Sequence, residues 1–224
     1  MTSPLSPAAQ GPEHAARQRE TRRTQKARSQ ETRDRILRSA LKILQQQGYQ
    51  KARLQDIAAG AGVTLGALQH QFGNRQSLME HVVDEVMRPL AHLGEDWSMR
   101  AQLLPLDARA HKFVRSAWDN VYGTRRYLAA WSLFFGAQQT DLFGRIEAHR
   151  ERHDPIYNEH FINTFPEVRR HHPQAEVVAE SIFATLRGLS IMQLFAGQPE
   201  QLPIQLELLA NQIIKAGQPE PTSQ

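Results

Sequence analysis

The chain has 224 residues, of which 27 are Lys or Arg and 23 are Asp or Glu, so its formal net charge is +4. It contains no cysteine, which excludes disulfides, thiolate metal sites and cysteine nucleophiles. This length allows one or two domains with a core that needs no covalent cross-link. Its apolar runs fall far short of the ~20 residues that cross a bilayer, and three prolines interrupt the first dozen residues, where a signal segment would lie. We therefore expect a cytoplasmic protein without a membrane partner.

The positive charge is concentrated near the N-terminus. Between Arg17 and Arg38 there are nine basic and three acidic residues, while the rest of the chain carries 18 basic and 20 acidic residues. A dense positive segment attracts polyanions, because every neutralised phosphate releases condensed counterions. Charge alone leaves two interpretations open, a nucleic-acid-binding segment and a solvated disordered tail.

Residues 1–28 lack apolar periodicity and predict a disordered basic arm. A stripe at 3–4 spacing then predicts a helix over 30–47, and Gly48 is placed to end it. The apolar positions that follow predict helices near 54–60, 65–71 and 75–92. The middle two are too short to be stable alone and need their neighbours to bury their apolar faces. The stripe of the first helix consists of Ile36, Leu37, Ala40, Leu41 and Leu44.

Beyond residue 93 the pattern stays helical and shows no strand-like alternation. Helices are predicted near 107–122, 124–138, 140–164, 173–196 and 201–215, and Pro155 is expected to kink or split the third of these. The fold class is therefore all-α. The predicted organisation is an arm (1–28), a three-helix domain with a helix-turn-helix (29–75), a larger helical domain (76–217) and a disordered tail (218–224).

The two short helices joined by Gly60-Ala61-Gly62 form a helix-turn-helix. Ala58 is small where the helices cross, and Gly62 suits a backbone state that a Cβ disfavours. Thr64 is a suitable N-cap for the second helix. The residues between its buried positions face outward, and glutamine side chains among them can bond adenine edges.

Residues 30–80 resemble the N-terminal domain of the tetracycline-repressor (TetR) family of bacterial transcriptional regulators. The resemblance implies an N-terminal DNA-binding domain followed by a helical effector-binding and dimerisation domain. The matching residues are Thr32, Arg33, Ile36, Leu37, Ala40, Leu41, Leu44, Gly48, Tyr49, Asp56, Ile57, Ala58, Ala61, Gly62, Val63, Thr64, Gly66, Leu68, His70, Phe72 and Leu78.

Four positions depart from the family pattern. Arg53 stands where the family has Ser or Thr, and Gln69 stands where it favours Tyr. Gln71 replaces His or Tyr, and Arg75 replaces Lys with its charge kept. Arg53 cannot cap a helix through a hydroxyl, but it can meet a phosphate directly.

We expect the helix from Thr64 to Gln71 to enter the major groove of double-stranded DNA, and the basic arm to add phosphate or minor-groove contacts. One such helix reads too few bases for a specific site, so a homodimer on a palindromic operator is expected. The candidate DNA-binding residues are Arg22, Arg23, Lys26, Arg28, Arg53, Gln55, Thr64, Leu65, Gly66, Ala67, Gln69, His70, Gln71 and Arg75.

The middle helices concentrate aromatic residues and are the expected effector pocket for a small organic ligand, although the same rings can simply fill the core. These residues are Trp118, Tyr127, Trp131, Phe134, Phe135, Tyr157 and Phe161. The last two predicted helices are apolar over more than one face. The resemblance implies that they form the dimer interface, and a single larger core is the alternative. The interface candidates are Ile182, Leu186, Leu189, Met192, Leu206, Leu209 and Ile213.

No phosphate loop, nucleophile elbow or cofactor motif is found, and neither an enzymatic function nor a cofactor is expected. His149, His153 and His160 could share a helix face, but Pro155 and nearby arginines argue against a metal site. The favoured function is a repressor that releases DNA on meeting a ligand. A ligand-independent regulator or activator working through a protein partner, and an enzyme or carrier with an incidental helix-turn-helix, are the alternatives.

Overall fold

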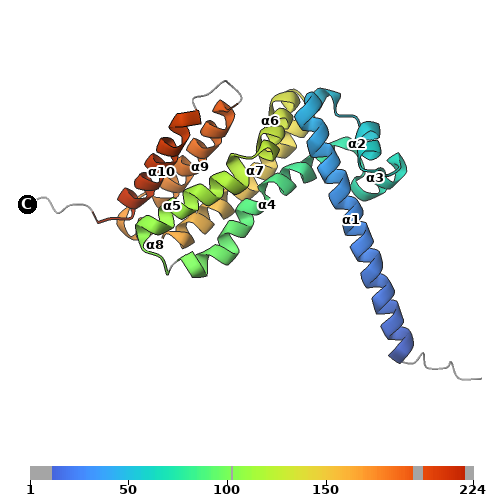
Figure 1. Cartoon of the computed structure of the whole chain (residues 1–224), viewed down its shortest axis with the longest axis horizontal. Helices are drawn as coiled ribbons and strands as arrows, with labels where there is room; N and C mark the ends of the chain where they lie inside the picture. The colour runs from blue at the N-terminus through green and yellow to red at the C-terminus, as the bar shows by residue number, and fades with distance from the viewer. Residues whose placement is uncertain (1–11, 102, 194–198, 220–224) are drawn as a thin grey trace, which may run out of the picture.

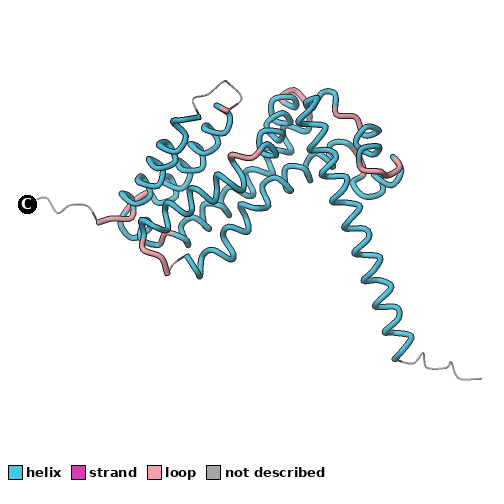
Figure 2. Tube along the Cα trace, in the orientation of Figure 1, coloured by secondary structure: helices cyan, strands magenta, loops and turns pink. Residues whose placement is uncertain are grey.

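The computed structural model describes residues 12–101, 103–193 and 199–219, and within these ranges every regular element is helical (Figures 1 and 2). Two elements are single irregular turns, the π-helical η1 and the 3-10 η2. The elements in chain order are α1 (Pro12–Lys51), α2 (Leu54–Gly60), α3 (Leu65–Phe72), α4 (Arg75–Ala101), α5 (Leu106–Ala117), η1 (Trp118–Tyr122), α6 (Arg125–Ala137), α7 (Asp141–Thr164), α8 (Pro166–His171), α9 (Ala175–Met192), η2 (Pro199–Gln201) and α10 (Leu202–Ala216).

The helices form two groups, joined by α4. The C-terminal half of α1 packs with α2 and α3 at one end of the molecule, and α4 to α10 form a larger bundle (Figure 1). Helices α9 and α10 lie at the side of the bundle farthest from α2 and α3 (Figure 1). The predicted all-α architecture is confirmed.

The apolar stripe of α1 is the core of the small group. Ile36, Ala40 and Leu44 are buried, and so are Ile57 of α2 and Leu68 of α3. Both short helices thus bury their apolar sides in a common core. That burial stabilises helices too short to persist alone.

The N-terminal segment differs from the prediction. Residues 12–28 were expected to be a disordered arm, but α1 runs continuously from Pro12 into the small domain. The segment is rich in Ala, Arg, Glu, Gln and Lys, which have high helix propensity, and Pro12 suits a first helical position. The lack of an apolar stripe misled the prediction, because it reports burial rather than helicity. Residues 1–11 lie outside the described residues.

Smaller differences lie in the larger bundle. The predicted helix 107–122 ends in the π-helical turn η1, and the short helix α8 was not predicted. Helix α7 continues through Pro155 as one element rather than splitting. Helix α9 ends at Met192, and the rest of its predicted range, from 194, lies outside the described residues, as does the tail from 220.

A buried ion pair fixes α8 to the bundle. The Arg109 guanidinium on α5 is 2% exposed as a residue and pairs with the Glu167 carboxylate of α8. It also lies 5.6 Å from the centre of the Phe165 ring. The contact orders the turn between α7 and α8 against α5.

Candidate DNA-binding surface and ligand pocket

The turn between α2 and α3 has the geometry that the sequence predicts. Gly62 has φ of 65°, a left-handed state that residues with a Cβ rarely adopt. The Val63 amide donates to the Ala58 carbonyl at 3.0 Å and closes the turn. The Thr64 Oγ1 accepts a hydrogen bond from the Ala67 amide at 3.1 Å, which confirms its expected N-cap role. The direction of α3 is therefore fixed by local chemistry.

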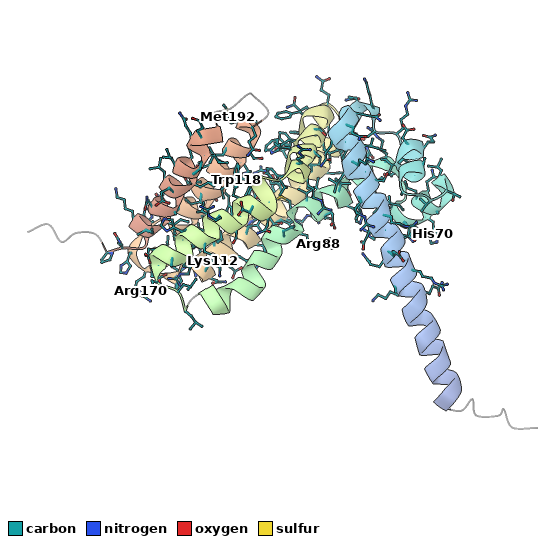
Figure 3. The ribbon with its side chains drawn as sticks, viewed as in Figure 1. His70, Arg88, Lys112, Trp118, Arg170 and Met192 are labelled. Atoms are coloured by element: carbon teal, nitrogen blue, oxygen red, sulfur yellow. The ribbon has the colours of Figure 1, made fainter. Side chains whose placement is uncertain are left out.

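One side of α3 is exposed to solvent and the other is buried against the small domain. Leu68 and Phe72 are buried, whereas Gly66, Gln69 and His70 are exposed. Figure 3 shows His70 at the end of the molecule formed by the small domain, far from Met192 on α9. A short, rigid helix with an exposed polar face is the arrangement that reads base edges in a major groove.

Predicted DNA-binding residues converge on a hollow beside α3. A surface depression of about 410 Å³ lies between the start of α2 and the start of α3. Arg53 and Gln55 line it from α2, and Leu65 and Gln69 from α3. Arg53 is the N-cap residue of α2, makes no side-chain capping bond and is exposed. Its guanidinium is thus available to a phosphate.

Arg75 lies at the same hollow but has a structural role. Its Nε donates to the Ala52 carbonyl at 3.0 Å, and its Nη2 donates to the Tyr49 carbonyl. The guanidinium also lies 4.0 Å from the centre of the Tyr49 ring. Arg75 was proposed from sequence as a DNA contact. In the structure its side chain connects the start of α4 to the turn between α1 and α2.

Gln71 is likewise held inside the domain. Its Nε2 donates to the Ser29 Oγ at 3.0 Å, and the Arg33 Nη1 donates to its backbone carbonyl at 3.4 Å. Arg33 also stacks over the Phe72 ring at 4.4 Å. The end of α3 is thus joined to α1, and the exposed reading face is confined to its earlier residues.

The arm candidates are positioned only in part. Lys26 and Arg28 are exposed on α1. Arg22 and Arg23 lie on the described backbone of the same helix, and their side chains lie outside the described residues.

A cavity of about 380 Å³ lies among α4, α6, α7 and α9. Four of the seven predicted pocket residues line it: Tyr127, Trp131, Phe134 and Tyr157. Burial raises the pKa of Tyr157 to about 12 and raises the pKa of Tyr127 further. Both phenols are therefore neutral at pH 7 and retain an O–H that can donate to a ligand.

The other three predicted pocket residues lie elsewhere. Phe161 is fully buried and packs edge-on against Phe113 at 5.6 Å between ring centres. Trp118 is buried in η1. Phe135 is 50% exposed, because one residue beyond Phe134 turns the side chain about 100° around the helix. Sequence showed where aromatics concentrate but not which way each one faces.

The polar side of the pocket was not predicted. It consists of Glu147, Arg150, His153 and Asp154 of α7 with Arg187 of α9. The Asp154 carboxylate lies 3.2 Å from the Arg150 guanidinium and 3.7 Å from that of Arg187. The α7 residues follow helical spacing, a signal present in the sequence. Arg187 carries no such signal, because only the tertiary fold brings it to α7.

The C-terminal helices require a correction of the proposed interface. Ile182, Leu186, Leu209 and Ile213 are buried in the protomer's own core, so a partner subunit cannot reach them. Leu189 and Leu206 are half-buried, and Met192 is exposed. The apolar side chains that α9 and α10 expose are Val177, Met192, Ile204 and Leu208.

The two helical groups meet at Gly136 of α6. The Gln50 Nε2 donates to the Gly136 carbonyl at 2.8 Å. Tyr49 packs so closely that a Cβ added at Gly136 would lie 2.9 Å from the Tyr49 Cβ. The same α6 carries Tyr127, Trp131 and Phe134 of the pocket. One helix thus touches both the cavity and the DNA-binding domain.

No group of three histidine, cysteine, aspartate or glutamate side chains in residues 12–101, 103–193 and 199–219 could hold a metal ion. The His149 side chain lies outside the described residues. In the same part of the chain no helix is both long and apolar enough to cross a membrane.

Comparison with known proteins agrees with this geometry. Residues 36–82 match the family model described as bacterial regulatory proteins, tetR family. The transcriptional regulator BetI of Cronobacter sakazakii is 25% identical over 75% of this chain and 81% of its own length. The regulator TtgR of Pseudomonas putida is 34% identical over 38% of this chain, and that match spans 40% of TtgR.

Solved structures extend the likeness to most of the chain. NalD of Pseudomonas aeruginosa, the secondary repressor of the MexAB-OprM multidrug efflux pump, superposes with a TM-score of 0.60 at 21% identity, covering 84% of this chain and 97% of NalD. The fatty acid degradation regulator FadR of Bacillus halodurans gives 0.62 at 16% identity, covering 82% and 96%. At these identities the structures establish the fold.

The fold and the exposed α3 are those of a helix-turn-helix DNA-binding protein. The helix-turn-helix domain at residues 36–82 is of the TetR type, and the protein is a DNA-binding transcriptional regulator.

Proposed function

We propose that this protein is a cytoplasmic, ligand-responsive repressor that binds a palindromic operator as a homodimer. The observation that carries the proposal is the exposed polar face of α3, held rigid by the Gly62 turn and the Thr64 cap. Rigid presentation of Gln69 and His70 supports reading of base edges, and Arg53 supports contact with a flanking phosphate.

Two-fold pairing would supply the second reading helix. The exposed apolar side chains Val177 and Met192 of α9 and Ile204 and Leu208 of α10 support an interface between copies of these helices. Ile204 and Leu208 are 62% and 63% exposed and, four residues apart on α10, lie on the same face of that helix. This surface replaces the one proposed from sequence.

The cavity supports a small organic effector. Its aromatic residues would pack against an apolar body, and its charged residues on α7 and α9 would fix polar groups. The ligand would relieve repression by favouring an α6 position in which the two reading helices no longer match the operator.

The DNA-binding proposal is tested with fragments that the full chain selects from random-sequence DNA. We expect the selected sites to share a dyad. Gln69→Ala and His70→Ala should each reduce the preference for that site by about 1–3 kcal/mol per base read, while Arg170→Ala on exposed α8 leaves it unchanged. Selection of no dyad, or equal losses for all three variants, would contradict the proposal.

The ligand proposal is tested by thermal shift with a library of small organic compounds. A compound that stabilises the chain should lose its effect in Trp131→Ala and should release operator DNA. A binder that leaves DNA affinity unchanged would favour the ligand-independent regulator instead.

A further inference from the structure

Three charged side chains form a cluster where two cavities meet. The Arg150 Nη1 lies 3.2 Å from the Asp154 Oδ2 on α7, and the Arg187 Nη1 of α9 lies 3.7 Å from the same oxygen. All three residues line both the cavity of about 380 Å³ and a second cavity of about 340 Å³ among α4, η1, α7 and α9. A ligand in either cavity can therefore reach the cluster.

The cluster carries more positive charge than it neutralises, because two guanidinium groups share one carboxylate oxygen. The contact of Arg187 with Asp154 is longer than a hydrogen bond, so it uses none of the Arg187 N–H donors. These two side chains are each 28% exposed, and charges with little water around them attract a counter-ion more strongly. A cationic ligand would have to displace both arginines from Asp154, whereas an anion meets an unmatched positive charge.

Two phenols add hydrogen-bond donors beside the cluster. Burial raises the pKa of Tyr127, and the Arg187 guanidinium partly opposes that rise. Burial and the Asp154 carboxylate raise the pKa of Tyr157 to about 12. Both phenols therefore keep their protons at pH 7 and can donate to an anionic group together with the guanidinium groups.

Glu147, the other carboxylate of the larger cavity, lies at its aromatic end. It precedes Asp154 by seven residues, or about 10.5 Å along α7. It follows Phe143 by one turn, and the centre of the Phe143 ring lies 5.1 Å from that of Phe134. Glu180 of the second cavity is exposed, and solvent ions screen its charge. A single anionic group is thus favoured at the arginine end and repelled at the aromatic end.

We propose that the effector is an organic monoanion, whose carboxylate binds Arg187 and Arg150 in competition with Asp154. This inference rests on the proposed ligand response and names the chemical class of the ligand. The apolar or aromatic body of the ligand would lie against Trp131 and Phe134. The ligand would then replace Asp154 as the bridge between α7 and α9, so its binding would act on the helix whose exposed side chains are proposed to pair with a second copy.

The test uses three probes with one body and three head groups: 6-phenylhexanoate, 6-phenylhexanamide and 6-phenylhexylamine. Their length suits the cavity, because Tyr127 and Phe134 at its two ends lie about 10.5 Å apart along α6. Affinities for the full chain are measured at pH 7 by isothermal titration calorimetry. We expect the acid to bind at least about tenfold more tightly than the neutral amide, and the amine, a cation at this pH, to bind most weakly.

Two variants in the cluster should change the acid affinity in opposite directions. Arg187→Gln should lower it to that of the amide, while an unchanged amide affinity reports an intact cavity. Asp154→Asn removes the competing carboxylate and should raise the acid affinity severalfold. The matched control is Arg169→Gln on exposed α8, which removes an arginine that pairs with Glu176 at 3.4 Å outside both cavities and should leave all three affinities unchanged.

The amide or amine binding as tightly as the acid, or no binding of the acid, would overturn the inference and leave an effector of other chemistry possible. A lower acid affinity in Asp154→Asn would also overturn it, because the cluster would then serve only to join α7 to α9. If Asp154→Asn does not fold, the ratio of acid to amide affinity in Arg187→Gln decides the question. Operator DNA that stays bound when the acid fills the cavity would instead overturn the proposed ligand response and leave the anion site standing.

Discussion

Substitution of Gly136 by alanine tests the contact between the two helical groups. The new Cβ would lie 2.9 Å from the Tyr49 Cβ and Cδ1 and 3.2 Å from Cγ. The Tyr49 Cβ is attached directly to the backbone, so rotation of the side chain cannot relieve the clash. Either α6 or the end of α1 must move.

The expected cost follows from two opposed effects. Overpacking of a tight contact costs about 1–3 kcal/mol, and alanine in place of glycine inside a helix recovers about 0.5–1 kcal/mol. The net destabilisation is then about 0–2.5 kcal/mol, and each kcal/mol lowers the midpoint of thermal unfolding by about 2–4 °C for a chain of this size. Because Tyr49 also supports Arg75, DNA affinity should change as well.

Gly144→Ala is the matched control, since a Cβ at Gly144 on α7 meets nothing within 4 Å. It should raise stability by about 0.5–1 kcal/mol and leave DNA binding unchanged. Thermal unfolding and fluorescence anisotropy with operator DNA measure both quantities. If Gly136→Ala were as stable as Gly144→Ala and bound DNA like the wild type, the close contact at Tyr49 would have no energetic role.

Three further predictions concern single contacts. Thr64→Ala removes the hydrogen bond to the Ala67 amide and should lower the free energy of unfolding, measured with denaturant, by about 1 kcal/mol. Thr64→Ser keeps the hydroxyl and should change it little. Equal losses in the two variants would contradict the capping role. Arg109→Met leaves the Glu167 carboxylate without its partner and should lower the free energy of unfolding by about 3 kcal/mol. The double variant Arg109→Met/Glu167→Met should recover most of that loss. If it recovers none, packing rather than the ion pair explains the loss. The hydrogen bond that His111 Nε2 donates to the Glu207 carboxylate raises the pKa of His111. This pair therefore stabilises the fold below pH 6.5 and loses its contribution as the pH rises through the raised pKa. Glu207→Gln should lower the free energy of unfolding by less than about 1 kcal/mol, because the pair is exposed. The loss should be larger at pH 6 than at pH 8.5. Equal losses at the two pH values would refute a contribution from the His111–Glu207 pair.

The small domain was predictable because its signals are local. The Gly62 turn, the Thr64 cap and the stripe from Ile36 to Leu44 each depend on residues a few positions apart, and each is found in the structure. Local signals also set the positions of most helices in the larger bundle.

The features that the sequence did not predict depend on contacts between residues far apart in the chain. A helix that is apolar on several sides does not say which side meets its own core, so Ile182 and Leu186 were assigned to an interface but lie inside the protomer. The pocket needs Arg187 of α9 beside Asp154 of α7, a proximity that no spacing encodes. The carbonyls of Tyr49 and Ala52 that Arg75 engages are likewise far from it in sequence, so its structural role could not be predicted.

The junction at Tyr49 gives the proposed ligand response a physical route. Contacts of the proposed ligand with Trp131 would act on α6. Because a packed helix shifts as a unit, such a shift would reach Gly136 in the same element. Tyr49 meets Gly136 on one side and the Arg75 guanidinium on the other, and Arg75 begins α4 while holding the turn before α2. A hundredfold change in operator affinity requires about 2.7 kcal/mol of coupling, comparable to the cost of one overpacked contact. A displacement of α6 that compresses or releases this single junction would therefore supply enough energy for the proposed switch.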